Sequence, residues 1–365
     1  MRNKPSVRRF GRLLAAVCLV GALMVSFSGC GESTVDSVKE DDDAIRIGFC
    51  FDSFVIERWH RERDIFVSAA EELGAEVNVQ NANGDIKEQI RQIDYLIEKG
   101  VDVIVVVHVA DDELSINGAL ARAEAAGIPV IAYDRLVMDA DVDLYISFDN
   151  EEVGRLMAEH MISHIGEGEI LMVCGPLADH NVVQVEKGFS DILAKYGDPL
   201  TVVKTEHAVN WLAETGLYVT SEYLNDHEPP KGVMCGNDSI AGQVVKALAE
   251  QRLAGDVCVV GQDADLDACQ RIMEGTQCMT VYKPVEKLAR RAAEIAVGMA
   301  RDKMPEDVTD TINNGKTDVL YCKLEPIAIT RENMDEEITG KYHEAADIYL
   351  NVEQENEEES SGTSK

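Results

Sequence analysis

The sequence predicts an α/β protein with two doubly wound parallel sheets. From residue 45 to about residue 284, apolar runs rich in Val and Ile alternate with polar segments of helical periodicity. Two stretches, 126–135 and 253–263, also share one sequence pattern. Each contains a helix end, a Gly turn and an apolar strand, and then a carboxylate, Asp134 or Asp263. Ligands of open parallel sheets collect outside the carboxyl ends of the strands. We therefore expect two similar lobes that face one polar ligand.

The first series of elements covers residues 45–147. The run 45–51 is apolar at nearly every position, and residues 57–73 carry a helical stripe that includes Ile65, Phe66 and Ala69. The same alternation continues along the chain. The predicted strands are 45–51, 76–80, 101–107, 129–133 and 144–147, and the predicted helices are 57–73, 86–98 and 114–126.

The second series covers residues 153–282 and repeats the alternation. Its strands are continuous Val/Ile runs, which is typical of parallel strands that are buried on both faces. The predicted helices are 153–164, 183–196, 213–226, 240–251 and 264–274, and the predicted strands are 170–174, 201–205, 232–235, 257–261 and 278–282.

The first 29 residues are predicted to be a signal peptide. Five basic residues precede an apolar run from Leu13 to Phe27, which is shorter than the about 20 residues of a spanning helix. Ser28-Gly29-Cys30 resembles a lipobox, so Cys30 is expected to carry a lipid that holds the exported chain on the extracytoplasmic face of the cell membrane. The alternative is an ordinary secretory signal in which Cys30 is incidental. Residues 30–43 are expected to form a flexible acidic tether, and residues 351–365 a disordered acidic tail.

The charge and the cysteines exclude several classes of function. A net charge of −33 makes nucleic acid and anionic membrane surfaces poor partners, apart from the lipid anchor. Four of the nine cysteines, Cys50, Cys174, Cys235 and Cys258, lie in apolar strands, where Cys is usually a small buried hydrophobe. The chain has no C-x-x-C motif and no Cys/His ligand spacing, so neither a metal nor another cofactor is expected. His160 and His164 lie four residues apart on a predicted helix, but a pair without a third ligand nearby is more often surface.

Polar and aromatic side chains follow the ends of the predicted strands. Carboxylates and amides match vicinal hydroxyls, Arg and Lys add charged donors, and Trp stacks on the C–H face of a sugar ring. For each residue the alternative is a turn or a helix cap, and for Trp211 it is packing in the interior. The residues concerned are Asp52, Arg58, Trp59, Asp134, Arg135, Asp179, His180, Asn181, Trp211, Asn237, Asp238, Asp263 and Lys283.

Several short motifs make a family resemblance specific. The chain contains VIERW at 55–59, RDIFV at 63–67, VQNANG at 79–84, AYDR at 132–135, LYISFDN at 144–150, GQDAD at 261–265 and MTVYKP at 279–284. In this order they resemble the D-xylose-binding proteins of bacterial ABC importers, which are type I periplasmic sugar-binding proteins. The resemblance extends from about residue 45 to about residue 342.

The resemblance implies roles for individual residues. Asp179 would make a second contact, and Trp59 and Trp211 would sandwich the sugar ring. His180, in a loop that is usually richer in Ser and Asn, is a departure at the pocket rim and leaves the choice among xylose, arabinose, glucose and galactose open. Hydrogen bonds to the sugar would come from Arg58, Asp134, Arg135, Asn181, Asn237, Asp263 and Lys283.

The resemblance also implies how the lobes are built. In this family the chain crosses between the lobes three times, and the expected crossings lie near Asn150, near Lys283-Pro284 and near residues 313–315, where Asn-Gly and Pro supply turn chemistry. Residues 44–150 and 284–312 would form the N-terminal lobe, and residues 151–283 and 313–350 the C-terminal lobe. The expected state is a monomer.

Three functions compete at this stage. The first is a lipid-anchored binding protein that captures a monosaccharide, with D-xylose as the leading candidate, and delivers it to ABC permease subunits. The second is a sensor of the same fold that signals to a membrane histidine kinase. The third is an enzyme, either a glycosidase with Asp134 and Asp263 as its carboxylates or a Schiff-base enzyme with Lys283 as its amine. The cations beside those carboxylates would keep them ionised as acceptors, so we expect no catalysis.

Overall fold

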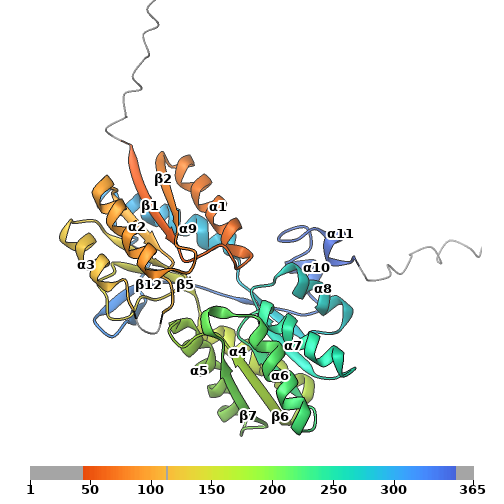
Figure 1. The fold of residues 1–365 in the computed structure, drawn as a ribbon. Coiled ribbons are helices and arrows are strands. Elements are labelled where there is room, and N and C mark those ends of the chain that lie inside the picture. Colours follow the sequence, from red (N-terminus) through yellow and green to blue (C-terminus); the bar gives the residue numbers. More distant parts are fainter. Residues whose placement is uncertain (1–43, 112–113, 351–365) are drawn as a thin grey trace, which may run out of the picture. The chain divides into compact units, whose positions relative to one another are not determined.

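The structure is a computed structural model that describes residues 44–111 and 114–350, and its strands form two sheets (Figure 1). The predicted signal peptide, Cys30, the acidic tether and the acidic tail lie outside these residues. Among the helices of the described part, none is long and apolar enough to cross a membrane.

The first sheet has seven strands in the order β11-β12-β5-β4-β3-β1-β2. All neighbouring pairs are parallel except β11 with β12, at one edge. The strands are β1 (Ile45–Phe51), β2 (Ala75–Asn81), β3 (Val103–Val106), β4 (Val130–Tyr133), β5 (Leu144–Phe148), β11 (Thr311–Asn313) and β12 (Asp318–Leu324).

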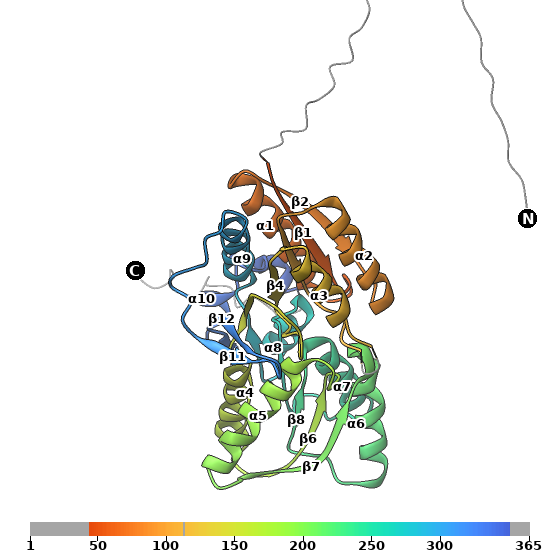
Figure 2. The same ribbon diagram turned by 90° about the vertical axis from the view of Figure 1, so that its left-hand side faces the viewer.

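Helices cover both faces of the first sheet (Figure 2). On one face, Phe49 packs with Phe66 of α1 (Arg58–Glu72) and with residues of α9 (Val285–Met299). On the other face, Ile104 packs with Leu96 of α2 (Ile86–Lys99) and with residues of α3 (Asn117–Ala125). Burial on both faces explains the continuous apolar runs of these strands.

The second sheet has six strands in the order β13-β10-β9-β8-β6-β7, of which only β13 is antiparallel to its neighbour. Its strands are β6 (Gly168–Cys174), β7 (Leu200–His207), β8 (Gly232–Cys235), β9 (Cys258–Gln262), β10 (Met279–Tyr282) and β13 (Ile327–Ile329). Its helices are α4 (Asn150–Ile165), α5 (His180–Lys195), the 3-10 turn η1 (Val209–Trp211), α6 (Glu214–Asp226), α7 (Asp238–Glu250), α8 (Leu266–Glu274), α10 (Met334–Glu337) and α11 (Ala345–Ile348).

Two glycines allow α4 and α5 to pack with their backbones in contact. A Cβ at Gly154 would lie 1.9 Å from the carbonyl oxygen of Val185, and a Cβ at Gly188 would lie 1.9 Å from the carbonyl oxygen of Glu151. Neither position has room for a side chain. This close pair of helices covers one face of the second sheet, and α6 and α7 contribute to the core on the other face.

The chain passes between the two sheets three times, and the last crossing corrects a predicted boundary. Residues 313–350 were expected in the C-terminal lobe, but β12 pairs in parallel with β5 over the register from Leu320↔Leu144 to Leu324↔Phe148. The chain reaches the second sheet only after Leu324, at β13. The edge of β5 would otherwise expose unpaired backbone groups. β12 covers that edge, and its Tyr321 ring stacks on Tyr145 with the centroids 4.7 Å apart.

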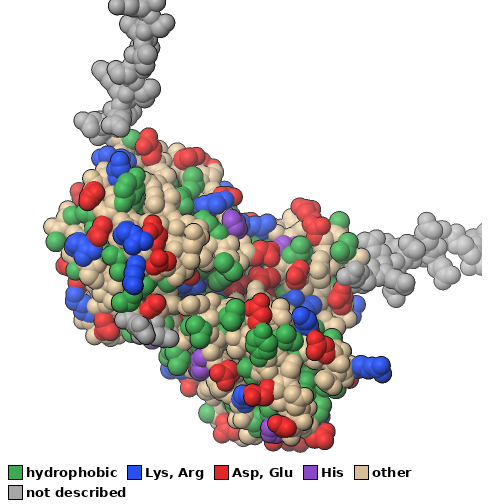
Figure 3. Space-filling model, viewed as in Figure 1, with side chains coloured by type: hydrophobic (Ala, Val, Ile, Leu, Met, Phe, Trp, Pro, Cys, Tyr) green, Lys and Arg blue, Asp and Glu red, His purple; other side chains and the backbone are tan. Residues whose placement is uncertain are grey.

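Charged side chains of both signs are spread over the face shown in Figure 3, and carboxylates outnumber Lys and Arg in the sequence. This arrangement fits a solvated surface. It gives no indication of which ligand the protein takes.

Candidate functional site

All the residues predicted to contact a sugar line one small pocket of about 20 Å³. The first sheet and its loops provide some of them and the second sheet provides the others. Two further residues, Ile56 and Gln262, complete the lining. The predicted residues are Arg58, Trp59, Asp134, Arg135, Asp179, Asn181, Trp211, Asn237, Asp263 and Lys283.

The two aspartates singled out in the sequence occupy equivalent places in the two sheets. Asp134 follows β4 directly, and its backbone N–H donates to the carbonyl oxygen of Ile146 at 2.8 Å. Asp263 follows β9 directly, and its N–H donates to the carbonyl oxygen of Val281 at 2.9 Å. Both have a positive φ, 62° and 100°, which turns the chain sharply at the strand end. Each carboxylate is thereby held at the carboxyl edge of its sheet.

Two of the predicted residues are helix caps and pocket residues at the same time. Asp179 caps α5, because its Oδ1 accepts from the N–H of Asn181 at 3.1 Å. Asn237 caps α7, because its Oδ1 accepts from the N–H of Ile240 at 2.9 Å. The alternative role as a cap therefore holds for both residues. The capping bond uses one oxygen of each side chain, and the other oxygen of Asp179 contacts Arg135 and Trp211.

Arg58 joins carboxylates from both halves of the pocket. Its Nη1 lies 2.5 Å from Glu62 and its Nη2 lies 2.7 Å from Asp134, while its Nε lies 3.5 Å from Asp263. Lys283 adds a second cation 3.3 Å from Asp263. All five side chains are buried. The charges therefore form one network instead of separate surface pairs.

Arg135 forms a second bridge between the halves. Its Nη1 donates to Asp52 at 2.7 Å, and its Nε lies 2.8 Å from Oδ2 of Asp179. The same oxygen accepts from Nε1 of Trp211 at 3.3 Å. A third link runs from Nδ2 of Asn181 to the carbonyl oxygen of Asp134 at 3.0 Å. These contacts hold the residues that close the pocket.

The buried network sets the protonation of its acids. Burial raises the pKa of Asp134, but the positive charges of Arg58 and then Lys283 outweigh it, and the net pKa lies below its ordinary value. Burial raises the pKa of Glu62 to about 7, against the lowering effect of Arg58. Burial likewise raises the pKa of Asp179 in spite of Arg135. Asp134 is thus held as an ionised acceptor, which suits hydroxyl recognition and not acid catalysis.

Several buried polar atoms around the pocket have no hydrogen-bond partner among the described residues. They are Nε of Arg58, Nε1 of Trp59, Oε1 of Gln262 and Oδ1 of Asp263. Buried polar groups are nearly always satisfied, and an unsatisfied one costs about 1–3 kcal/mol. The two donors come from α1 on the side of the first sheet, and the two acceptors come from the end of β9 in the second sheet. A ligand with several hydroxyl groups can satisfy such a set, because each hydroxyl donates and accepts.

The two tryptophans lie in different settings at the pocket. Trp59 is buried, with the guanidinium of Arg58 4.1 Å from its ring centroid. The ring of Trp211 lies so close to Gly175 that a Cβ there would meet it at 2.4 Å. Trp211 is also partly buried against the cores on both faces of the second sheet. It therefore packs in the interior and lines the pocket.

The sequence reasoning missed Gln262. Gln262 stands inside the GQDAD motif, directly before Asp263, and its Nε2 donates to the carbonyl oxygen of Gly236. Its position directly before Asp263 was the signal that could have identified it as a pocket residue. His180 begins α5 and is not among the residues that line the pocket, so its place at the rim stays a prediction.

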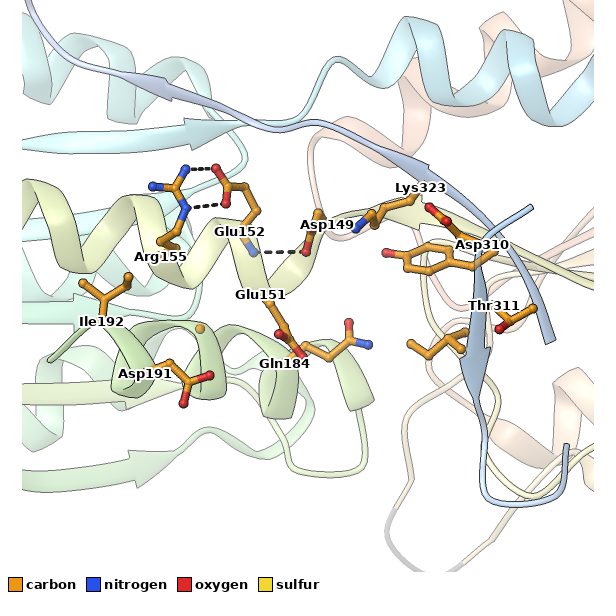
Figure 4. A pocket seen from close by; sticks show the side chains of 13 residues that line it. Asp149, Glu151, Glu152, Arg155, Gln184, Asp191, Ile192, Asp310, Thr311 and Lys323 are labelled. Atoms are coloured by element: carbon orange, nitrogen blue, oxygen red, sulfur yellow. Dashed lines mark hydrogen bonds and ion pairs between the residues drawn. The ribbon is translucent and has the colours of Figure 1, made fainter. Parts of the chain in front are cut away.

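A larger cavity of about 600 Å³ lies where α4 and α5 face β11 and β12 (Figure 4). Several of its charged side chains form ion pairs. Glu152 binds Arg155, and Lys323 lies 3.0 Å from Asp149, whose Oδ1 also caps α4. None of the unsatisfied buried atoms found in the described chain belongs to a lining residue of this cavity. The smaller pocket is therefore the better candidate site.

The described residues contain two groups of side chains that could hold a metal ion, and both lie outside the pocket lining. One consists of His160, Cys258 and Cys278. The other consists of Cys174, Glu186 and His207. The ligands that the sequence pattern did not offer to His160 are thus Cys258, at the beginning of β9, and Cys278, directly before β10.

Comparison with known proteins places the chain among binding proteins. A family model described as "Periplasmic binding protein domain" matches residues 47–304. The D-xylose-binding periplasmic protein of Haemophilus influenzae is 39% identical over 92% of this chain and 98% of its own length. That of Escherichia coli is 38% identical over 87% of this chain and 97% of its own. The crystal structure of an ABC transporter solute-binding protein from Clostridium phytofermentans with bound β-D-glucose is similar at a TM-score of 0.74 and 26% identity, over 83% of this chain and 99% of that one.

Proposed function

Because the chain belongs to the type I periplasmic sugar-binding proteins, a family of solute-binding proteins and not of enzymes, we propose that it captures a monosaccharide in the pocket lined by both sheets. D-xylose is the leading candidate. The two relatives at 38–39% identity are named D-xylose-binding periplasmic proteins, and they are similar over most of this chain.

The observation that carries the proposal is the set of buried polar atoms at the pocket that make no hydrogen bond, from Arg58, Trp59, Gln262 and Asp263. Two of them, Nε of Arg58 and Oδ1 of Asp263, meet only as an ion pair at 3.5 Å. A neutral sugar presents hydroxyls that both donate and accept, whereas a phosphate would bring further negative charge to Asp134 and Asp263. Micromolar affinity corresponds to about 8 kcal/mol. A few hydrogen bonds to charged groups, at about 1.5–3 kcal/mol each, supply this after the costs of association.

Entry of the sugar requires the two halves to separate. A cavity of about 20 Å³ is far below the about 300 Å³ at which small-molecule pockets begin. Contacts from both halves stabilise only the closed arrangement, so the sugar shifts the population towards closure. We place the hinge at the three crossings, with residues 44–150 and 284–324 in one lobe and residues 151–283 and 325–350 in the other.

In this proposal the closed protein delivers its sugar to an ABC transporter on the extracytoplasmic side of the membrane. The solved relative with bound β-D-glucose is described as a solute-binding protein of such a transporter. A lipid on Cys30 would keep the protein beside its permease. Transport is therefore preferred over signalling to a histidine kinase. Deletion of the gene for this chain would abolish uptake of its sugar in the transport case and leave uptake intact in the sensor case.

The direct test is isothermal titration of residues 31–365 with xylose, arabinose, ribose, glucose and galactose. We expect one site per chain and the tightest binding for xylose. A preference for another sugar of the panel would keep the capture function and change the substrate. No heat with any of the five would mean that the pocket takes a different class of ligand.

A further inference from the structure

A cluster of soft metal ligands lies at the end of the second sheet opposite to the pocket. Cys258 begins β9, and Cys278 directly precedes β10, the neighbouring parallel strand. Asp263 lies at the other end of β9, five residues and about 16 Å of strand away. The cluster is therefore separate from the pocket residues, although it belongs to the same strands.

Helix α4 brings a histidine to the two thiols. His160 lies in the last turns of α4, a helix whose residues share one core with Cys258 and Cys278. One ligand atom from each of the three residues lies within 4.8 Å of the others. Nε2 of His160 is buried and has no hydrogen-bond partner among the described residues. Neither Cys258 nor Cys278 forms a disulfide bond.

We propose that His160, Cys258 and Cys278 form a zinc site. Thiolate sulfur and imidazole nitrogen are the ligands that zinc prefers, at about 2.3 and 2.0–2.1 Å. Tetrahedral geometry at those bond lengths separates ligand atoms by roughly 3.5–3.8 Å, so small side-chain shifts from the spacing found here suffice. Binding releases the two thiol protons to solvent. Water takes the fourth position, or His164 does, one turn further along α4, where its ring stacks on that of His160 with the centroids 5.7 Å apart.

The second group of candidate ligands is a weaker site. Nε2 of His207 lies 2.7 Å from Glu186, so these two side chains already satisfy one another. A metal would have to break that pair, and only Cys174 would add a soft ligand. Nothing comparable competes for Nε2 of His160. This difference decides between the two groups and makes His207 a matched control.

A bound zinc ion would join α4 to two strands of the second sheet. Because α4 begins directly after the first crossing between the sheets, the ion would stiffen the lobe without touching the sugar pocket. The proposal does not rest on the choice of sugar. A failed sugar titration and a failed metal titration are therefore separate results.

The test is titration of residues 31–365 with Co²⁺, after purification with a reductant and without metal. Thiolate ligands give a charge-transfer band with Co²⁺, and tetrahedral geometry gives intense visible bands that Zn²⁺ then removes. We expect one Co²⁺ per chain. Loss even of an outer-shell partner costs 10–100-fold in metal affinity, so Cys278→Ser and His160→Gln should each weaken binding by about 100-fold or more. His207→Gln and Cys322→Ser should bind as the wild type does.

Thermal unfolding provides the second measurement. Zn²⁺ should raise the midpoint of the wild type and of both controls, but not that of Cys278→Ser or His160→Gln, since only a site in the folded state stabilises it. The two ligand variants change different elements, so misfolding of one leaves the other informative.

Three results would overturn the zinc site. The first is the absence of the thiolate band in the reduced wild type. The second is a band of unchanged affinity in Cys278→Ser. The third is a Cys258–Cys278 disulfide in protein collected from its export compartment, detected as a mass lower by two hydrogens that a reductant restores.

Discussion

Replacement of Asp134 by Asn tests the central claim that an ionised carboxylate recognises the sugar. Asp134 is 3% exposed, and its Oδ2 accepts from Nη2 of Arg58 at 2.7 Å. Its φ of 62° is strained for most residues but is tolerated by Asn. Asp134→Asn therefore removes the charge and keeps the shape and backbone, whereas Ala would add strain.

The expected loss follows from hydrogen-bond energies. A bond to a charged group contributes about 1.5–3 kcal/mol and one between neutral groups about 0.5–1.5 kcal/mol. The variant should thus lose about 1–2 kcal/mol of binding free energy, which is roughly a 5- to 30-fold weaker affinity for xylose. Arg58 keeps Glu62 and Asp263 as partners. The loss of unfolding free energy should therefore stay below the about 3–5 kcal/mol of a buried charge left unpaired.

The pH dependence of stability has a definite sign. The net pKa of Asp134 lies below the ordinary 3.8, because Arg58 and Lys283 outweigh the effect of burial. Its ionised form stabilises the wild type at pH values above 3.8, and this contribution is lost as the pH falls through the lower, folded-state value. The stability difference between wild type and Asp134→Asn should therefore shrink below about pH 3.8.

The assay is isothermal titration with xylose at pH 7, together with urea unfolding. Asp265→Asn is the matched control, because burial and then Asp238 raise the pKa of Asp265 to about 8 and leave it mostly neutral at that pH. Its xylose affinity should stay within about twofold of the wild type. Unchanged affinity in Asp134→Asn, or an equal loss in both variants, would refute the reasoning.

Three further predictions concern packing and buried charge. Trp211→Ala should weaken xylose binding by about 0.5–1.5 kcal/mol plus the lost contact area, and unchanged heats on titration would leave Trp211 with a packing role alone. Gly154→Ala should lower the urea midpoint by the equivalent of about 1–3 kcal/mol, because its Cβ would meet the Val185 carbonyl oxygen at 1.9 Å. The control is Gly242→Ala in α7, whose Cβ would meet only a flexible Arg side chain and should cost no stability. Equal midpoints of the two variants would contradict the close packing of α4 and α5. Burial raises the pKa of Glu62 from 4.5 to about 7, so the free energy of unfolding should fall as the pH rises from about 4.5 to 7. Glu62→Gln should lack this pH dependence. The same pH dependence in wild type and variant, measured by urea unfolding, would contradict the prediction.

Local patterns in the sequence were sufficient for most of the fold and for the pocket. Parallel strands buried on both faces leave continuous apolar runs, and such runs end where the chain turns at the carboxyl edge. Asp134, Asp263 and Lys283 stand directly after such runs, so their meeting at one edge follows from the strand order. Asn181 and Trp211 stand several residues beyond the ends of β6 and β7, so their strand-end signal is weaker.

Other features depend on partners that are distant in the chain. The segment that became β12 has alternating burial, and only the free edge of β5 decides that it pairs there. Likewise, 98 residues separate His160 from Cys258, and no spacing rule connects a helix position with the beginnings of two strands. Their approach results from the packing of α4 on β9 and β10.

The sequence alone therefore determined the helices and strands and the residues at the strand ends, because these features depend on neighbours within one element. Which sheet took the last strand, which cation reached Asp263 and which cysteines faced a histidine were decided by the tertiary structure. The physical reason is that such contacts depend on which edges and faces remain uncovered once the sheets have formed, and close packing then leaves a single way to cover them.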